Sequence, residues 1–164
     1  MRRKRQRGNA MVEFAFTGTI FLMVWIGTVQ LAIGMWRYHT IQYAAKTAGS
    51  YTTLHGSNCS TGGNSCSVAI KDIASVLKQN LIGIDPSAVT VTFNAMANDH
   101  VTVASTVTCQ LSGGGTPCLS NTTPWPPSSN NSPGTDIEIK TEYQLKSTLA
   151  TVWLPGFTHQ TILF

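Results

Sequence analysis

A long uncharged apolar stretch near the N-terminus most constrains what this chain can fold into. After Glu13 no charged residue occurs until Arg37. An α-helix over residues 10–36 would be about 40 Å long at ~1.5 Å per residue. The hydrocarbon core of a bilayer is about 30 Å thick. The sequence therefore predicts one transmembrane helix.

Glu13 is an acidic residue at the start of this apolar stretch, and its position needs an explanation. Moving a carboxylate into hydrocarbon costs at least about 2.5–3.5 kcal/mol. The helix dipole favours an acid in the first turn, which explains why Glu13 is tolerated there. The alternative is that Glu13 binds a positive charge from a partner. A cut after Gly8 would give Asn9 a free α-amine, four residues away in the same helix or in a neighbouring subunit.

The basic charge of the chain is concentrated at its N-terminus. Five of the eleven Lys and Arg residues lie within residues 1–7, and from Asn9 onward six basic residues face seven acidic ones. The positive-inside rule places residues 1–7 in the cytoplasm and the region from Arg37 outside. A leader that a peptidase removes is a compatible interpretation. No nucleic-acid partner is expected, because such a partner requires a basic patch on a folded surface.

The predicted helix continues beyond the membrane, to about residue 54. Trp36, Tyr38 and Tyr43 are amphipathic aromatics that suit the outer interface. Apolar and small residues then recur at helical spacing; they are Ile41, Ala44, Ala45 and Ala48. A cleaved signal peptide is the alternative, with these alanines near its cleavage site. Its apolar core would be only about 7–15 residues long, which is shorter than the stretch found here.

Two glycines in the apolar stretch are candidates for helix packing. Gly27 and Gly34 lie seven residues apart and therefore share one face of the helix. Small residues on a membrane helix allow another backbone to approach closely. The alternative is that glycine is simply common in membrane helices.

The region after residue 54 has the pattern of a small α+β domain. Apolar residues at i, i+3 and i+4 spacing over residues 68–81 predict one amphipathic helix, with Ser67 as its N-cap and Gly83 near its end. Alternation of apolar and polar residues then predicts strands over 89–93, 101–109 and 137–145, with a fourth over 161–164. The predicted fold class is α+β: a long transmembrane helix, then one helix on a three- or four-stranded antiparallel sheet.

A long polar loop is expected over residues 112–135. It contains three consecutive glycines from Gly113 and the Pro-rich run 124–127, which is expected to be extended. Loops of this length without structure are uncommon and usually functional or mobile. Trp125 lies within the loop, and we expect it to pack on the domain rather than to bind a partner.

Four cysteines follow the membrane segment, and two local disulfides are the favoured pairing. Cys59 and Cys66 would form one, and Cys109 and Cys118 the other, because each closes a short loop at low entropic cost. The alternative is a zinc site helped by His55 and His100. The chain has no C-x-x-C spacing, which argues against zinc. No metal or other cofactor is expected.

Catalytic motifs are not found in the sequence. The four histidines are His39, His55, His100 and His159, and none has an acid or nucleophile at a recognisable spacing. The glycine-rich segments are not followed by the helix and lysine of a phosphate-binding loop. An enzyme is therefore not expected.

The run Arg7-Gly8-Asn9-Ala10-Met11-Val12-Glu13-Phe14-Ala15 resembles the start of the TadE-like family of pseudopilins. The small-residue stretch 43–49 is similar to that family's segment just beyond the membrane helix. The resemblance implies that a prepilin peptidase cuts between Gly8 and Asn9. It also implies that Glu13 and Phe14 serve processing and assembly.

The resemblance implies a minor pilin or pseudopilin of a tight-adherence (Tad/Flp) pilus, with a role in pilus assembly and surface adhesion. Three regions follow: a cleaved leader 1–8, a transmembrane helix with a periplasmic extension 9–54, and a periplasmic domain 55–164. Expected partners are the prepilin peptidase, other pilin subunits, the inner-membrane assembly platform and lipid. The alternative is an uncleaved inner-membrane anchor that presents a periplasmic binding domain.

Overall fold

The computed structural model describes residues 6–55, 68–97, 99–114, 116–131, 134–145 and 160–163. The chain divides into two compact units, Met1–Trp36 and Arg37–Phe164.

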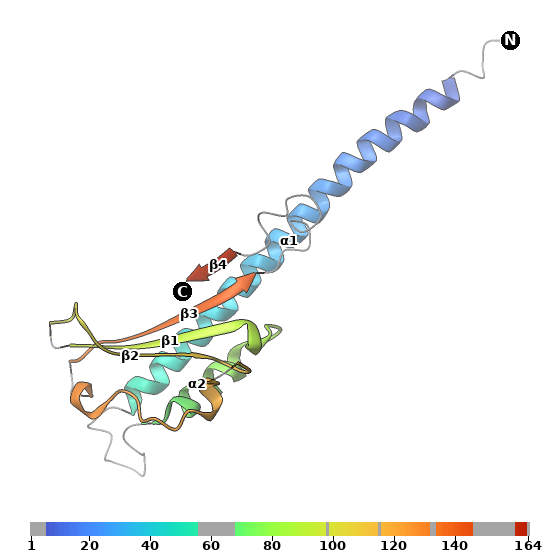
Figure 1. The fold of residues 1–164 in the computed structure, drawn as a ribbon. Coiled ribbons are helices and arrows are strands. Elements are labelled where there is room, and N and C mark those ends of the chain that lie inside the picture. The colour runs from blue at the N-terminus through green and yellow to red at the C-terminus, as the bar shows by residue number, and fades with distance from the viewer. Residues whose placement is uncertain are drawn as a thin grey trace. The chain divides into compact units, whose positions relative to one another are not determined.

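Helix α1 spans Gln6–Leu54 and confirms the long N-terminal helix. The first unit consists of its early part, drawn in blue in Figure 1. The side chains from Ala10 to Trp36 are exposed or half-buried in this unit. By length and composition the helix can cross a membrane, and none of the residues in its most apolar window is buried.

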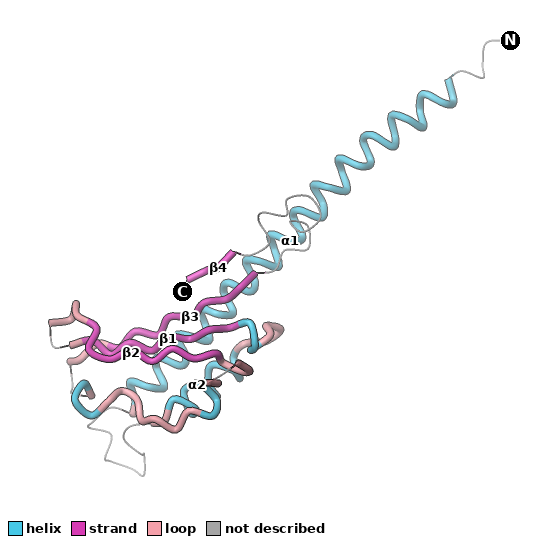
Figure 2. The backbone as a smooth tube through the Cα atoms, in the orientation of Figure 1, coloured by secondary structure: helices cyan, strands magenta, loops and turns pink. Residues whose placement is uncertain are grey.

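The second unit contains a four-stranded antiparallel sheet in the order β2-β1-β3-β4 (Figures 1 and 2). Its strands are β1 (Val89–Met96), β2 (Val103–Gln110), β3 (Ile137–Leu145) and β4 (Gln160–Leu163). The predicted α+β fold class and the fourth strand are confirmed. The alternation in the sequence predicted β1 because one of its faces is more deeply buried than the other: Val89, Val91 and Phe93 are fully buried, whereas Thr90 and Thr92 between them are half-buried.

Two helical segments cover the buried face of the sheet. Helix α2 (Ile70–Asn80) is the predicted amphipathic helix. The last part of α1 supplies a second layer through Ile41, Ala44 and Ala48. These residues share one cluster with the strand residues; the buried members from α2 and β1 are Ile70, Ile73, Ala74, Leu77, Val89, Val91, Phe93 and Ala95.

Two details of the sequence-based prediction were wrong, the residue before α2 and the start of β2. The first residue before α2 is Ala69, not Ser67, which lies outside the described residues; Asp72 accepts a hydrogen bond from the Ala69 N–H at 3.3 Å. The end of α2 agrees with the prediction, since the helix ends at Asn80 and Gly83 follows shortly after it with a positive φ of 72°. Strand β2 begins at Val103, because Val101 lies in the turn after β1 and is 80% exposed.

The long loop after β2 is more ordered than its composition suggested. It contains the short 3-10 turns η2 (Cys118–Ser120) and η3 (Ser128–Asn130), and a third turn, η1 (Pro86–Ala88), precedes β1. The backbone N–H of Trp125 donates to the Val68 carbonyl at 2.8 Å, and the backbone N–H of Ile70 donates to the Thr123 carbonyl at 3.0 Å. The loop thus satisfies backbone groups around the start of α2, which no pattern in the loop sequence indicates.

Candidate functional site

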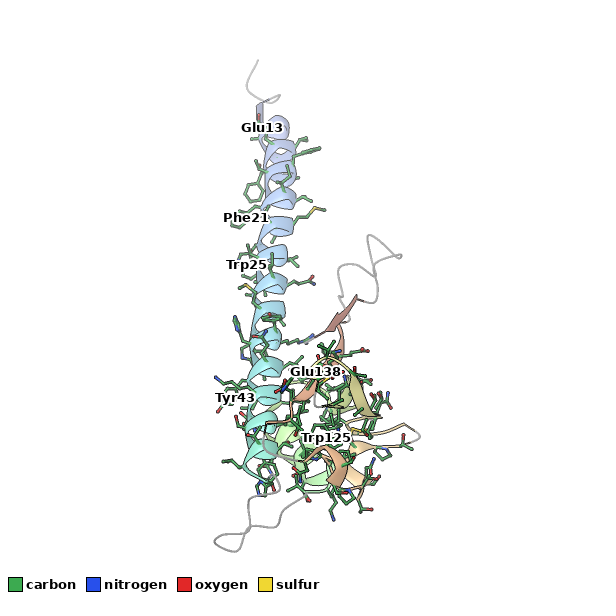
Figure 3. The ribbon with its side chains drawn as sticks, turned by 90° about the vertical axis from the view of Figure 1, so that its left-hand side faces the viewer. Glu13, Phe21, Trp25, Tyr43, Trp125 and Glu138 are labelled. Carbon is green, nitrogen blue, oxygen red and sulfur yellow. A yellow bond between two sulfur atoms is a disulfide. The ribbon has the colours of Figure 1, made fainter. Side chains whose placement is uncertain are left out.

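The candidate processing site lies at the start of α1. Gly8 and Asn9 have helical backbone, and Glu13 and Phe14 follow one turn later. The Glu13 side chain is exposed on the helix (Figure 3), and its backbone carbonyl accepts a hydrogen bond from the Thr17 hydroxyl. Among the described residues, the Glu13 carboxylate has no hydrogen bond or ion pair. A counter-charge from another molecule is therefore sterically possible.

The rest of the first unit presents apolar side chains in all directions. Phe14 is 79% exposed, and Phe21 and Trp25 project outward from the helix in Figure 3. Gly27 and Gly34 are half-buried, and a Cβ added to either would meet no atom within 4 Å. The backbone at both glycines is thus open to an approaching helix, while their proposed role in packing stays a prediction.

The small-residue stretch of α1 has a structural role in the second unit. Ala44 and Ala48 are fully buried in the core cluster, next to Ile41. Tyr43, one position away from Ala44, is 63% exposed and points away from the helix (Figure 3). Alanine at the buried positions allows the helix backbone to lie close to its neighbours, because the side chain adds little volume.

Arg37 begins the second unit and lies against an aromatic ring of the sheet. Its guanidinium carbon is 6.0 Å from the ring centroid of Tyr143, within the range of a cation–π contact. Its Nε is buried and has no hydrogen-bond partner among the described residues. The sequence placed Arg37 only at the end of the apolar stretch; nothing in its neighbourhood along the chain indicated Tyr143.

The structure forms the predicted disulfide between Cys109 and Cys118, with Cα atoms 5.3 Å apart. The bond links β2 to the turn η2, and both cysteines are buried. Neither is available as a thiolate ligand for zinc. Cys59 and Cys66 lie outside the described residues, so their pairing stays a prediction.

Trp125 packs in the core, as expected. It is 1% exposed, and its ring centroid lies 5.3 Å from that of Phe93 on β1. Figure 3 shows Trp125 within the small domain. The indole therefore holds the long loop against the sheet and is not a free docking residue in this structure.

The face of the sheet opposite the core, which includes Thr92 and Asn94 and is called the wet face below, carries a polar network that spans three strands. Asn94 is 5% exposed; its amide nitrogen donates to the Glu138 carboxylate at 2.9 Å, and its amide oxygen accepts from the Thr106 hydroxyl at 3.0 Å. Lys140 lies 3.1 Å from the same carboxylate. The hydrogen bond from Asn94 and the charge of Lys140 lower the pKa of Glu138.

The hairpin tip between β1 and β2 brings together charged residues that sequence spacing did not connect. His100 Nδ1 and Asp136 Oδ2 are 2.8 Å apart across 36 positions. Asp99 accepts hydrogen bonds from the Thr102 hydroxyl and from the amides of Thr102 and Val101. These bonds lower the pKa of Asp99 to about 2. No sequence spacing indicated the pair of His100 and Asp136, because antiparallel strand pairing brings together two segments that are 36 positions apart.

Metal binding has no support in the described part of the chain. There, no group of three or more His, Cys, Asp or Glu side chains is close enough to hold an ion. The Nδ1 of His55, the residue directly after α1, instead lies 2.7 Å from the Tyr51 carbonyl oxygen.

A long apolar helix that leads into a small α+β domain is the plan of a pilin-like protein. Residues 8–49 match the family model described as TadE-like protein, which confirms the resemblance over this segment. The TadE-like family consists of pilin-like structural proteins associated with Tad pili and not of known enzymes. Searches of curated proteins and of solved structures found no match.

Proposed function

We propose that this chain is a minor pilin or pseudopilin of a tight-adherence (Tad/Flp) type IV pilus system. A prepilin peptidase removes residues 1–8, and the mature protein takes part in pilus assembly and surface adhesion. One observation carries the proposal: Gly8, Asn9, Glu13 and Phe14 begin an exposed apolar helix inside the segment that matches the TadE-like family.

Glu13 is proposed to select the assembled state. Two unit charges 4 Å apart attract by about 1 kcal/mol in water and by about 4 kcal/mol at an effective dielectric constant of ~20. The α-amine of Asn9, created by cleavage, is a cation that can meet Glu13 in the same helix or in an adjacent subunit. An uncleaved chain has no amine at this position, so cleavage and assembly become coupled.

The proposed location is the bacterial inner membrane, with one span. Residues 1–7 face the cytoplasm, and the region from Arg37 onward faces the periplasm. The disulfide between Cys109 and Cys118 fits an oxidising compartment. The proposed partners are the prepilin peptidase, other pilin or pseudopilin subunits, the inner-membrane assembly platform and membrane lipid.

A minor rather than a major subunit is proposed because of the second unit. The resemblance implies that the major Flp pilins are much shorter and lack a sizeable outer domain. Here residues 37–164 form a compact unit with its own core and a four-stranded sheet. Such a domain provides surface for initiating, capping or completing a filament.

N-terminal sequencing of the membrane-extracted protein tests the proposal. In cells with a prepilin peptidase the chain should start at Asn9, and without the peptidase it should keep Met1. Gly8→Ala should leave the full-length protein in the membrane. An intact Met1 in the presence of the active peptidase would favour an uncleaved anchor with a periplasmic binding domain.

A second variant separates cleavage from assembly. Glu13→Ala should still be cut but should be absent from sheared pili, because its charge partner is lost. Thr17→Ala is the matched control, since Thr17 lies one turn later on the exposed helix and bonds only the Glu13 carbonyl in the described structure. Wild-type amounts of the Glu13→Ala protein in pili would remove the charge-pairing role.

A further inference from the structure

Within the described part of the chain, strand β2 is an outer strand of the sheet, and no strand pairs with its second edge. In the order β2-β1-β3-β4, its only strand neighbour among the described residues is β1 (Figure 2). Such an edge presents backbone donors and acceptors to any other extended chain.

The hydrogen-bond pattern shows which residues face outward from β2. The Leu111 N–H donates to the Val89 carbonyl at 2.9 Å, and the register continues without a shift as far as Ser105. In an antiparallel ladder, residues bonded to the neighbouring strand alternate with residues whose backbone groups point away. Thr106 and Thr108 are of the second kind. Among the described residues, the backbone hydrogen bonds outside the helices and strands do not use them.

The open edge is limited at both ends. Gln110 already bridges to Pro117, next to the disulfide between Cys109 and Cys118. At the other end the register shifts, which leaves Ala104 without an opposite residue on β1. A partner strand can therefore bond to a window of two outward-facing residues, Thr106 and Thr108.

Strand β2 and the loop that follows it carry no charge; the charged groups of the polar network, Glu138 and Lys140, lie on β3, two strands away, and pair with each other. The sequence has no Asp, Glu, Lys, Arg or His between His100 and Asp136. Natural edge strands are commonly protected by charged side chains, often Lys, or by Pro. Neither occurs from Val103 to Gln110, and both Thr106 and Thr108 are exposed. Two copies of this edge can approach without repulsion, whereas a charged partner would gain no ion pair here.

We infer that this edge pairs with the same edge of a second copy of the chain. In an antiparallel arrangement about a two-fold axis beside Val107, Thr106 of each copy faces Thr108 of the other. In each such pair, the outward N–H of one residue donates to the outward C=O of the other, so that two hydrogen bonds form. The threonine side chains meet on the wet face, as Thr92 and Thr108 already do at 3.1 Å between β1 and β2. Because each copy offers only this one short window, the pairing joins two copies and does not continue to a third.

Amide hydrogen exchange on the full chain in lipid vesicles tests this inference independently of leader cleavage. The Thr106 and Thr108 amides should exchange about tenfold more slowly at high than at low protein-to-lipid ratio. The Val107 amide faces β1 and serves as an internal reference. Equal exchange of the two threonine amides at both ratios would overturn the inference, and this result does not depend on any variant folding.

Two lysine variants separate the edge from the rest of the wet face. Thr106→Lys should abolish the dependence of amide exchange on the protein-to-lipid ratio (the density dependence), because each copy would place a lysine against the strand of the other copy and the two positive charges would repel. Thr90→Lys is the matched control, since Thr90 lies on the same face but inside the sheet, opposite Glu142. A density dependence that survives in Thr106→Lys, or that is lost equally in Thr90→Lys, would contradict the inference. So would protection that arises only after other membrane proteins are added.

Discussion

Replacing Ala48 by Leu should destabilise the small domain strongly, because the site has no room. Ala48 and Ala44 are fully buried, and Ile41 beside them is 1% exposed. The change adds three carbon atoms to a filled position. Extra methylene groups in a packed core typically cost about 1–3 kcal/mol. This cost reduces the ratio of folded to unfolded domain by about 5- to 150-fold.

The measurement is urea unfolding of the full chain in detergent, followed by near-ultraviolet circular dichroism. A loss of about 2 kcal/mol lowers the urea midpoint by about 1 M when the slope is ~2 kcal/mol per M. We expect the apolar part of α1 to stay helical in the micelle, so that the transition reports the second unit.

Ala45→Leu is the matched control, because Ala45 is only half-buried and takes the same added atoms. Its midpoint should shift much less than that of Ala48→Leu. Equal midpoints for Ala48→Leu and the wild type, or an equal loss in Ala45→Leu, would refute the close packing of this part of α1 on the domain.

Two further predictions concern the loop and the hairpin tip. Replacing Cys109 and Cys118 together by Ser should lower the free energy of unfolding by about 2–3 kcal/mol, because the disulfide closes a short loop in the unfolded chain; the same urea titration measures it. The bonds at the hairpin tip should weaken as the pH falls from about 4 to about 2. The folded-state pKa of Asp99 is lowered to about 2, so its contribution is full above the ordinary pKa and is lost as the pH falls through the lowered one. Exchange rates or chemical shifts of the Val101 and Thr102 amides report this change.

Each of these predictions has an outcome that would contradict it. If the variant with Ser at positions 109 and 118 unfolded at the same urea concentration as the wild type, backbone hydrogen bonds alone would hold the segment after β2 in place. For the hairpin, Asp99→Ala should remove the pH dependence of both amides between about pH 4 and 2. If the dependence persisted in that variant, another carboxyl group would be its source.

The elements with strong periodicity were predictable from the sequence. The long uncharged apolar stretch predicted α1, and apolar residues at a helical spacing of about 3.6 residues predicted α2. Alternation identified β1 and β3, because both lie inside the sheet and bury one face. It failed at Val101, since the pattern continues into a turn that has no core beneath it. The start of α2 was missed because its cap depends on a loop more than 50 positions later, around Thr123.

The residues of the candidate processing site could be named from the sequence, because Gly8, Asn9, Glu13 and Phe14 lie within seven consecutive residues, and their role stays a prediction. Their chemistry depends on local spacing along one helix. By contrast, contacts of Arg37 with Tyr143, of His100 with Asp136 and of Asn94 with Glu138 join residues far apart in the chain. No local pattern encodes such pairs.

The sequence by itself determined the apolar helix and the fold class, because both follow from a long uncharged stretch and from periodicity. Only the tertiary structure decided why alanines follow the apolar stretch, which edge of the described sheet is open and where the long loop is anchored. Those features arise from strand order and from packing between distant segments. Register and volume fit become defined only when the segments meet.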